Sequence, residues 1–313
     1  SGVSITGDAA LAWLPGDGRV DPQGTAEALG IGAQNRGVRI IEGVRVTKVL
    51  HENGRVTGVE TTAGTVRAEK VVLAGGMWTR ALGQTCGVDI PLYPVEHHYA
   101  VSKPIEGARD DFPCMRDPDG TTYFRGDGNS ILLGAFQAYT KAWMVDPIPS
   151  DFRFQLLEED WAKFDPALQE GLHRIPALRE AGFERFVNGP ESFTPDNHFI
   201  LGETAPLRNL YIAAGFNSAG IACAGGAGRV LAEWIDGDEA PMDLWSVDPR
   251  RFTHAQNDTE YLRGRVTEVL GLNYQMAWPN REFATCRDLR HSSLHETLAA
   301  QGAVFGAKMG LER

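Results

Sequence analysis

The apolar positions of the chain change their spacing within one stretch, residues 209–237. Residues 210–214 form a short continuous apolar run, which predicts a buried strand. Residues 215–218 read Gly-Phe-Asn-Ser and predict a sharp turn, and the small residues that follow predict a helix. Asn217 and Ser218 belong to the residue types favoured as helix N-caps. The stretch therefore predicts a strand, a tight turn and a helix of small residues.

Small residues recur in this helix at a spacing of four. Gly220, Ala224 and Gly228 share one helix face. Glycine inside a helix costs about 1 kcal/mol relative to alanine, so a close approach of the backbone to another group is the usual compensation. That group could be a tightly packed sheet, or an electron-rich ligand at the positive N-terminal end of the helix. The strand, turn and helix alone leave both interpretations open.

The first 87 residues mix helix, hairpin and buried strand. Asp21-Pro22 is a typical helix start, and the helix pattern ends at Gly37. Asn53-Gly54 is a hairpin signal. The apolar pattern predicts strands at 38–41, 44–50 and 56–62, two short strands within 66–74, and a helix at 78–87. This mixture fits the later part of a two-dinucleotide-binding α/β domain.

From residue 88 onwards, strands separated by turns dominate. The pattern predicts strands at 93–101, 121–125, 130–134 and 186–193, and helices at 152–164 and 167–175. This region predicts an antiparallel sheet with helices, as a second domain. Residues 254–313 have weaker periodicity and predict mostly helix and loop.

Charge and cysteine content exclude several classes of protein. The 313 residues carry 41 Asp and Glu against 30 Lys and Arg, which argues against binding to nucleic acid or to an anionic membrane surface. No apolar run approaches the length of a membrane span. The four cysteines show no CxxC spacing, so we predict neither a disulfide scaffold nor a metal site, and a reducing compartment.

Four motifs together resemble one enzyme family. They are PGDGRVDP (15–22), VVLAGGMW (71–78), GPESFTPD (189–196) and GFNSAGIACAGG (215–226). In combination they resemble the glycine-oxidase-like FAD-dependent amine oxidoreductases, above all the sarcosine dehydrogenase and dimethylglycine dehydrogenase family. Residues 291–313 resemble the linker that precedes the folate-binding domain of those enzymes.

The resemblance implies an α/β (α+β) fold: the later part of a two-dinucleotide-binding FAD domain with an antiparallel-sheet substrate domain. The implied divisions are 1–87 (first part of the FAD domain), 88–185 (substrate domain), 186–240 (return to the FAD domain) and 241–313 (linker). The family's GxGxxG segment and its folate-binding domain are not in the sequence. We therefore expect a central fragment that by itself binds FAD weakly and is inactive.

The resemblance also implies cofactor contacts. The turn and helix start match the segment that places a helix N-terminus at the flavin pyrimidine edge, where reduced flavin carries negative charge. The residues are Gly215, Phe216, Asn217, Ser218, Ala219 and Gly220. Val46 matches a position whose backbone meets the adenine, or is an ordinary strand residue. Trp78 matches a cofactor-contacting tryptophan, or packs in the core.

The implied catalytic residues are His97 and Tyr123, and the implied substrate-binding residues are Tyr99 and Arg125. Period two places His97 and Tyr99 on one strand face and His98 on the other, towards solvent or core. His97 would orient the substrate amine or keep it neutral. Arg125 would pair with a carboxylate through two hydrogen bonds. The alternatives are a structural histidine and a cross-strand ion pair with an acidic neighbour.

The predicted activity is FAD-dependent oxidative N-demethylation of sarcosine to glycine, with hydride transfer to flavin N5. The resemblance implies an electron acceptor such as an electron-transfer flavoprotein, tetrahydrofolate bound by a C-terminal domain, and a cytoplasmic location (the mitochondrial matrix in a eukaryote). It leaves open whether the flavin is covalent. The rivals are a dimethylglycine dehydrogenase or oxidase, and a non-catalytic scaffold subunit that has lost its flavin.

Overall fold

The computed structural model describes residues 3–7, 10–279 and 281–313, and the chain folds into two compact units. Unit 1 comprises residues 1–44, 97–137 and 157–188, and unit 2 comprises residues 45–96, 138–156 and 189–313. Two of the five boundaries between them fall within long strands, β5 (Tyr93–Ser102) and β9 (Phe183–Phe193). The mixture of helices and antiparallel sheets confirms the predicted fold class.

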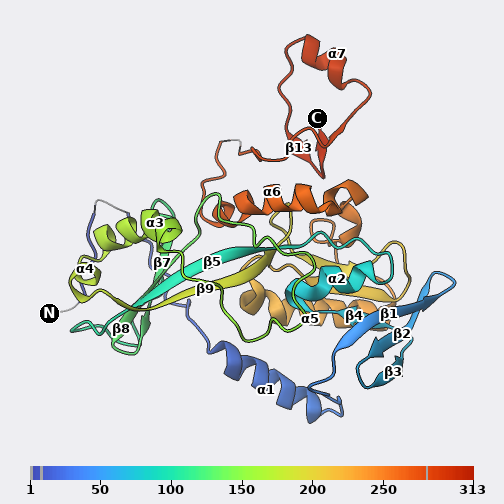
Figure 1. The fold of residues 1–313 in the computed structure, drawn as a ribbon, viewed down its shortest axis with the longest axis horizontal. Helices are drawn as coiled ribbons and strands as arrows, with labels where there is room; N and C mark the ends of the chain where they lie inside the picture. Colours follow the sequence, from blue (N-terminus) through green and yellow to red (C-terminus); the bar gives the residue numbers. More distant parts are fainter. Residues whose placement is uncertain (1–2, 8–9, 280) are drawn as a thin grey trace. The chain divides into compact units, whose positions relative to one another are not determined.

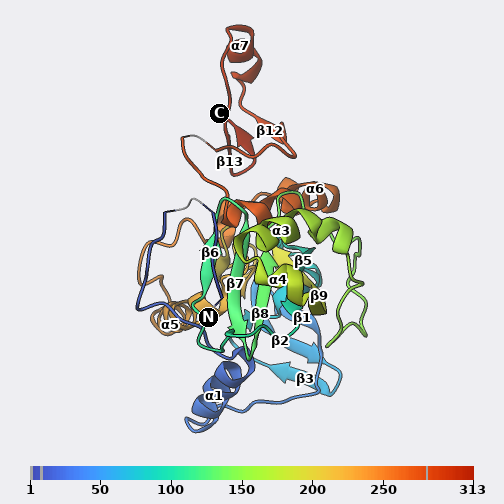
Figure 2. The ribbon, with the colours of Figure 1, turned by 90° about the vertical axis from the view of Figure 1, so that its left-hand side faces the viewer.

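Unit 1 is built on a five-stranded sheet in the order β6-β7-β8-β5-β9. In Figure 2 the strands β6, β7 and β8 lie side by side. Its remaining strands are β6 (Met115–Asp117), β7 (Thr122–Asp127) and β8 (Ser130–Ala135), and the β6–β7, β7–β8 and β5–β8 pairs are antiparallel. The helices α3 (Trp161–Arg174) and α4 (Ala177–Ala181) pack on this sheet (Figure 1).

The pleat of the sheet separates two kinds of residue in unit 1. Along β7 the buried side chains Thr122 and Phe124 alternate with the half-buried Tyr123 and Arg125. Phe124 belongs to an apolar core that residues of α3 and α4 share. Phe164 of α3 is fully buried in this core. One face of the sheet is thus committed to the core, and the other is left with polar side chains.

The predicted helix at 152–164 is wrong for most of its length. The helix α3 begins at Trp161, after Asp160, whose carboxylate accepts a hydrogen bond from the Lys163 amide at 2.9 Å. The residues before Asp160 are not helical, because their backbone makes tertiary bonds instead: the amide of Leu157 donates to the carbonyl of Asn188 at 2.8 Å. The helix predicted at 167–175 is the second half of α3.

The N-terminal elements are partly as predicted. The helix α1 (Pro22–Gln34) begins after Asp21, which accepts from the Gly24 amide at 2.7 Å. The strand predicted at 38–41 is wrong: these residues form no strand, since no described strand pairs with them and their side chains are exposed.

Unit 2 contains three small sheets. The first is an antiparallel meander of β1 (Val46–Glu52), β2 (Arg55–Thr61) and β3 (Gly64–Arg67), with Asn53-Gly54 at the β1–β2 turn, as predicted. In the second, β11 (Leu210–Ala214) lies parallel to β4 (Val71–Leu73) and antiparallel to β10 (Ile200–Glu203). Short helical turns complete this part: η1 (Gly76–Trp78), α2 (Thr79–Gln84), η2 (Pro249–Arg251) and η3 (His254–Asn257).

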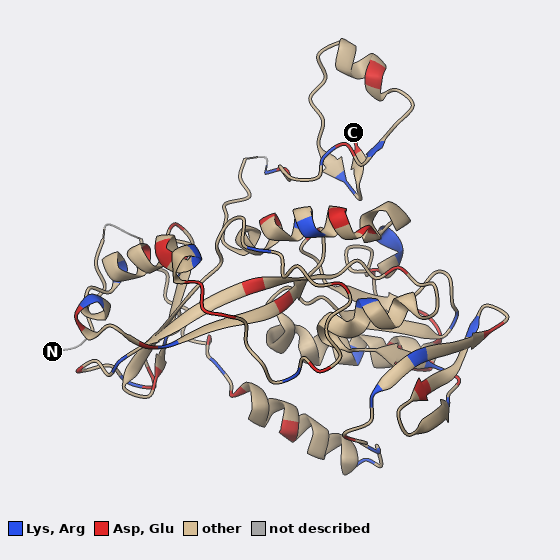
Figure 3. Ribbon diagram, viewed as in Figure 1, with Lys and Arg blue, Asp and Glu red and all other residues tan. Residues whose placement is uncertain are grey.

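The helix α5 (Gly220–Gly237) packs on β10 and β11 through its larger residues. Ala227, Leu231 and Trp234 are buried, and the Trp234 ring meets Tyr211 edge-on with centroids 6.1 Å apart. No helix of the described residues is long and apolar enough to cross a membrane. Acidic and basic residues are interspersed along the elements (Figure 3), so the net charge of −11 does not gather on one helix or strand.

The end of unit 2 carries a third sheet that the sequence pattern does not predict. After α6 (Thr259–Val269) and η4 (Leu270–Asn273), the sheet order is β12 (Arg290–His291), β14 (Leu311–Glu312) and β13 (Ala307–Lys308). The short helix α7 (His295–Ala300) lies between β12 and β13 in the sequence.

An ion pair holds this C-terminal segment, residues 281–313. Arg287 Nε donates to Glu312 Oε1 at 2.8 Å, and a second guanidinium nitrogen pairs with the other carboxylate oxygen. The Glu312 side chain is only 3% exposed and also accepts from the Asp288 amide at 3.0 Å. The hydrogen bond from Arg287 is the main reason that the pKa of Glu312 falls to about 2.

We predict that Glu312→Gln loosens the C-terminal segment. The pKa of Glu312 lies below its ordinary value near 4.5, so the contribution of the pair is complete above pH 4.5 and is lost as pH falls towards about 2. The difference corresponds to about 3 kcal/mol. Amide hydrogen exchange of residues 281–313, corrected for intrinsic rates, should lose protection at pH 7 in the variant. The exposed pair of Glu233 with Arg229 supplies the control: Glu233→Gln should change nothing measurable.

Candidate functional site

The polar face of the unit 1 sheet brings two predicted residues beside one glycine. Gly134 of β8 pairs with Tyr99 on one side and with Tyr123 on the other. A Cβ on Gly134 would lie 2.0 Å from Cζ of Tyr123, so the tyrosine ring lies directly over the glycine. Only a residue without a side chain leaves that space, and Gly134 therefore sets the position of the Tyr123 ring.

His97 belongs to an aromatic group on the same face. Its ring centroid lies 4.8 Å from that of Phe136 and 6.5 Å from that of Tyr123, and Tyr123 and Phe136 are 5.7 Å apart. His98 points the other way, is buried, and its Nδ1 lies 3.2 Å from Gln137 Oε1. The separation of the two histidines is as predicted, with His98 in the core.

Sequence reasoning missed both Gly134 and Phe136. The available signal was period two along β8, since Leu132, Gly134 and Phe136 follow alternate positions of the strand and its continuation. Phe136 is the contact that joins His97 to Tyr123, and so it shapes the surroundings of both predicted catalytic residues.

Arg125 lies on the Tyr123 face of β7 and already has an acidic neighbour. Its Nη1 lies 3.2 Å from Asp127 Oδ1 and donates to the carbonyl of Gly126 at 3.0 Å. Asp127 is shared, because Arg185 Nη2 donates to its other oxygen at 2.9 Å. The predicted alternative of an ion pair with an acidic neighbour therefore exists, although within one strand and not across strands. Arg125 remains one-third exposed.

The PGDGRVDP motif reaches the same hairpin through Arg19. This guanidinium donates to the carbonyls of Gly126 and Asp110, and pairs with the Asp110 carboxylate at 2.6 Å. The hydrogen bond from Arg19 is the main cause that lowers the pKa of Asp110. The motif thus fastens the loop before α1 to the β7–β8 hairpin that carries Arg125.

The predicted cofactor residues lie in unit 2, at the start of α5. Gly215 has φ +65°, and a Cβ there would lie 2.4 Å from Leu92 Cδ2, so this glycine is required by the tight packing of the turn. The prediction that Asn217 and Ser218 cap the helix is wrong. Asn217 Oδ1 accepts from the Thr194 amide at 2.9 Å, and Ser218 Oγ donates to Glu191 Oε2 at 2.6 Å. Both side chains hold the GPESFTPD segment instead.

The first turn of α5 consequently has no side-chain cap: Ala219 is in the N-cap position and makes no side-chain hydrogen bond. The face of Gly220, Ala224 and Gly228 is open, since Ala224 and Gly228 are exposed and an added Cβ at Gly228 would meet no described atom within 4 Å. The interpretation of this face as tight helix–sheet packing is therefore wrong. Uncapped N–H groups at a positive helix end, beside a face without side chains, fit a flat, electron-rich group such as the flavin ring.

The other two predicted cofactor residues are also accessible. Val46 begins β1 and is half-buried. Trp78 ends η1 with 41% of its surface exposed, so it does not pack in the core of the described chain. Each retains surface that a ligand could cover.

Comparison with known proteins identifies the class to which this fold belongs. Residues 5–234 match the family described as FAD dependent oxidoreductase, and residues 238–292 match the FAD dependent oxidoreductase central domain. The chain belongs to the FAD-dependent oxidoreductase family. The family resemblance in the sequence motifs is thereby confirmed at this level.

Individual proteins of known name are also similar to this chain. The chain is 43% identical to 4-methylaminobutanoate oxidase (formaldehyde-forming) of Paenarthrobacter nicotinovorans over 99% of its own length and 38% of that protein. It is 36% identical to mitochondrial sarcosine dehydrogenase of Mus musculus over 96% of its length and 33% of that protein. The chain thus spans less than two fifths of these relatives. L-proline dehydrogenase from P. horikoshii shares the fold, with a TM-score of 0.65, 25% identity, and coverage of 76% of this chain and 62% of that one.

We predict that Gly220→Val lowers flavin content without disturbing the chain. A Cβ at Gly220 would meet only Cβ of Phe216 at an ordinary 3.6 Å, so the described structure has room for it. A larger side chain at the open helix start should instead collide with a bound ring. The measurement is the ratio of flavin to protein absorbance in the purified full-length protein that contains this chain, with circular dichroism as the check on folding. Gly237→Val, at the open far end of the same helix, is the matched control. Equal flavin content in both variants would contradict this role of Gly220.

Proposed function

We propose that this protein carries out the FAD-dependent oxidative N-demethylation of a small N-methylated amino acid, with sarcosine as the first substrate to test. The observation that supports the proposal most is that a histidine and an arginine lie on the same sheet face in a member of this family, with Arg125 in register with Val101, four residues along β5 from His97. His97 offers a base for an amine, and Arg125 offers a cation for a carboxylate. An N-methyl amino acid carries both groups.

The task that we assign to His97 is to hold the substrate amine in its neutral form. A nitrogen lone pair assists the departure of hydride from the N-methyl carbon, whereas an ammonium has no lone pair to give. The imidazole packs on Phe136, and the contact at 4.8 Å restricts its orientation. Tyr123 and Tyr99 flank Gly134 on the same face, where their hydroxyl groups could orient the amine.

The task that we assign to Arg125 is to bind the substrate carboxylate. The guanidinium is one-third exposed, and its contact with Asp127 uses Nη1, so other N–H groups of the planar fork are available for an incoming anion. Arg19 and Arg185 lie around the same hairpin and add positive charge to this end of the sheet.

FAD, when bound, supplies the hydride acceptor at N5. The residues of this chain that we assign to it are those of the turn and uncapped helix start from Gly215 to Gly220, together with Val46 and Trp78. The positive end of α5 favours negative charge on the ring system. The fixed turn around Gly215 and Asn217, held by Thr194 and Leu92, would keep these amides in place.

The relatives' names set the substrates to compare. Sarcosine and 4-methylaminobutanoate are both secondary N-methyl amines with a carboxylate, at different separations, and dimethylglycine is the tertiary amine of the same series. Formaldehyde release and kcat/KM should be measured for all three in the full-length protein that contains this chain, with an artificial electron acceptor. Absence of bound flavin and of turnover in the full-length protein would favour the scaffold subunit instead. We propose an electron-transfer flavoprotein as the natural electron acceptor and tetrahydrofolate as the acceptor of the one-carbon unit. The location that we propose is the cytoplasm, or the mitochondrial matrix in a eukaryote.

We predict that Arg125→Ala raises KM for the carboxylate substrate by roughly thirty-fold. Loss of a charge-assisted contact costs about 2 kcal/mol at a site shielded from water, and each 1.4 kcal/mol is about tenfold in affinity. Arg125→Lys should recover little, because a point charge does not replace the planar fork. Arg109→Ala is the control, since it removes an exposed pair with Asp111 and should leave KM within about twofold. If Arg125→Ala also leaves KM within about twofold, Arg125 is only a member of the ion-pair network.

We predict that His97→Gln acts on kcat and not mainly on KM. Glutamine keeps a polar side chain next to Phe136 but cannot accept the amine proton, so kcat should fall about a hundred-fold or more. The acidic limb of the kcat–pH profile should change its midpoint as well. A purely structural histidine would alter stability and leave the shape of that profile unchanged. Steady-state kinetics between pH 5 and pH 10 decide between the two.

A further inference from the structure

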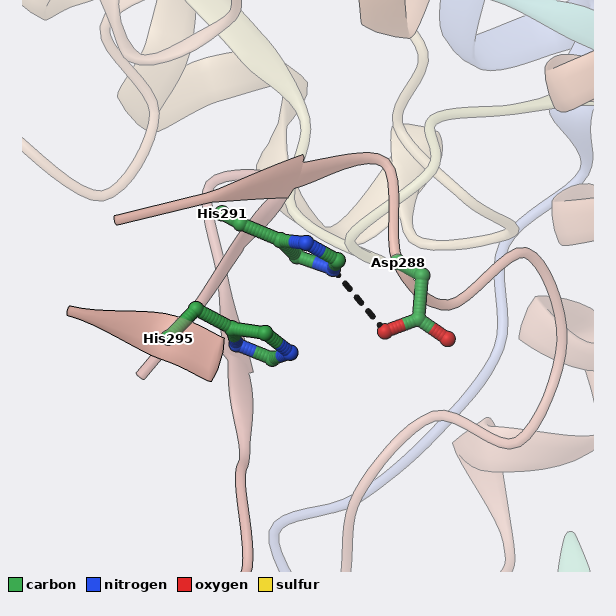
Figure 4. Close-up of side chains that lie close together, drawn as sticks. All are labelled: Asp288, His291 and His295. Atoms are coloured by element: carbon green, nitrogen blue, oxygen red, sulfur yellow. Dashed lines mark hydrogen bonds and ion pairs between the residues drawn. The ribbon is translucent and has the colours of Figure 1, made fainter. Parts of the chain in front are cut away.

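Three ligand-bearing side chains meet in the C-terminal segment, and none of them is a residue assigned above to the substrate or to FAD. Asp288, His291 and His295 each offer one nitrogen or oxygen atom, and these atoms all lie within 4.8 Å of one another. Figure 4 shows the two imidazole rings side by side, with an edge of His291 joined to the Asp288 carboxylate. This is the one such group of three among the described residues.

One of the distances between ligand atoms already matches that which a transition-metal ion imposes. Zn²⁺ binds imidazole nitrogen and carboxylate oxygen at about 2.0–2.2 Å, so ligand atoms of a tetrahedral site lie about 3.3 Å apart. His291 Nε2 and Asp288 Oδ1 are 3.0 Å apart, which matches one edge of that tetrahedron. The Asp288 and His291 side chains are 69% and 40% exposed. They can therefore turn to bring their ligand atoms to the spacing of about 3.3 Å that zinc requires.

The second imidazole is held in place by stacking. The His291 and His295 rings are nearly parallel, with centroids 3.7 Å apart, and Phe305 stacks on His295 at 4.1 Å. His295 Nδ1 is inaccessible to solvent and has no hydrogen-bond partner in the described chain. A buried ring nitrogen without a partner costs free energy. Because imidazole binds a metal ion in its ring plane, the two rings would turn out of their parallel stack to share one ion, and the bond would offset that cost.

The backbone fixes the relative places of the three residues. His291 is in β12, which pairs with β14, and His295 is the first residue of α7. Asp288 sits in a turn with φ +61°, and its amide donates to Glu312, which Arg287 holds from the other side. The ligands therefore come from a short stretch of chain that is anchored at both ends, so little ordering is needed to close the site.

We propose that Asp288, His291 and His295 form a binding site for a divalent first-row transition ion, with Zn²⁺ as the test ion. Two imidazoles and a carboxylate are ligands that suit zinc, and water would complete the coordination on the exposed side. The site would close the turn between β12 and α7 and stabilise the C-terminal segment. The proposal is independent of the proposed enzymatic activity, and it departs from the sequence prediction of no metal site.

Zinc titration of chelator-treated protein without a polyhistidine tag tests the proposal. Calorimetry and metal analysis should find one equivalent bound by the unaltered protein. Asp288→Asn, His291→Asn and His295→Asn should each weaken binding at least tenfold, since loss of even an outer partner of a metal ligand commonly costs 10–100-fold. His254→Asn is the matched control, because His254 Nδ1 lies 2.7 Å from Asp89 in an exposed histidine–aspartate pair without a third ligand.

Three results would overturn the site: no zinc bound by the unaltered protein, unchanged affinity in all three ligand variants, or loss of binding in His254→Asn. Should His295→Asn fail to fold, the two exposed positions still decide the matter. Co²⁺ substitution adds a spectroscopic check, because a site of nitrogen and oxygen ligands gives weak visible bands only. An intense near-ultraviolet thiolate band would instead assign the ion to one of the free cysteines and would also overturn the site.

Discussion

The alternation of side chains across one pleated sheet governs unit 1. Helices α3 and α4 must bury an apolar face, and the sheet supplies one by turning every second residue towards them. A shift of register by one residue would send Phe124 to the polar face and Tyr123 into the core. The residues that the core buries therefore determine which side chains remain to form the candidate site. The side chains of His97, Tyr123 and Arg125 point to the opposite face of the sheet for this reason.

A different constraint acts on the turn before α5. The side chains suited to cap this helix are used to tie the turn to Thr194 and Glu191, and so the helix begins without a side-chain partner for its first amides. Glycines on the neighbouring face keep the approach to those amides clear. Because Asn217 bonds to the Thr194 loop and not to the first amides of α5, the same side chain makes the turn rigid and leaves the helix start open.

Local patterns predicted the elements that local forces determine. The hairpin at Asn53-Gly54, the Asp21 cap and the strand before Gly215 depend on neighbouring residues, and the structure has all three. The errors have tertiary causes. The backbone of Leu157 and Glu158 bonds to Asn188 of the distant strand β9, residues 38–41 have no strand to pair with, and the sheet of β12, β14 and β13 is made of two-residue strands too short to show a period. Phe136 was missed because its role exists only across strands.

The double use of Asp127 has a consequence for how an anion could come and go. A carboxylate that loses its only cation in a partly buried place is left with an unbalanced charge, and that imbalance resists the exchange. Asp127 has two cations, Arg125 and Arg185, bound to different oxygens. When Arg125 turns to another anion, Arg185 still neutralises Asp127. An incoming carboxylate can therefore take the place of Asp127 on Arg125, as in ion exchange, because Arg185 continues to balance the charge of Asp127.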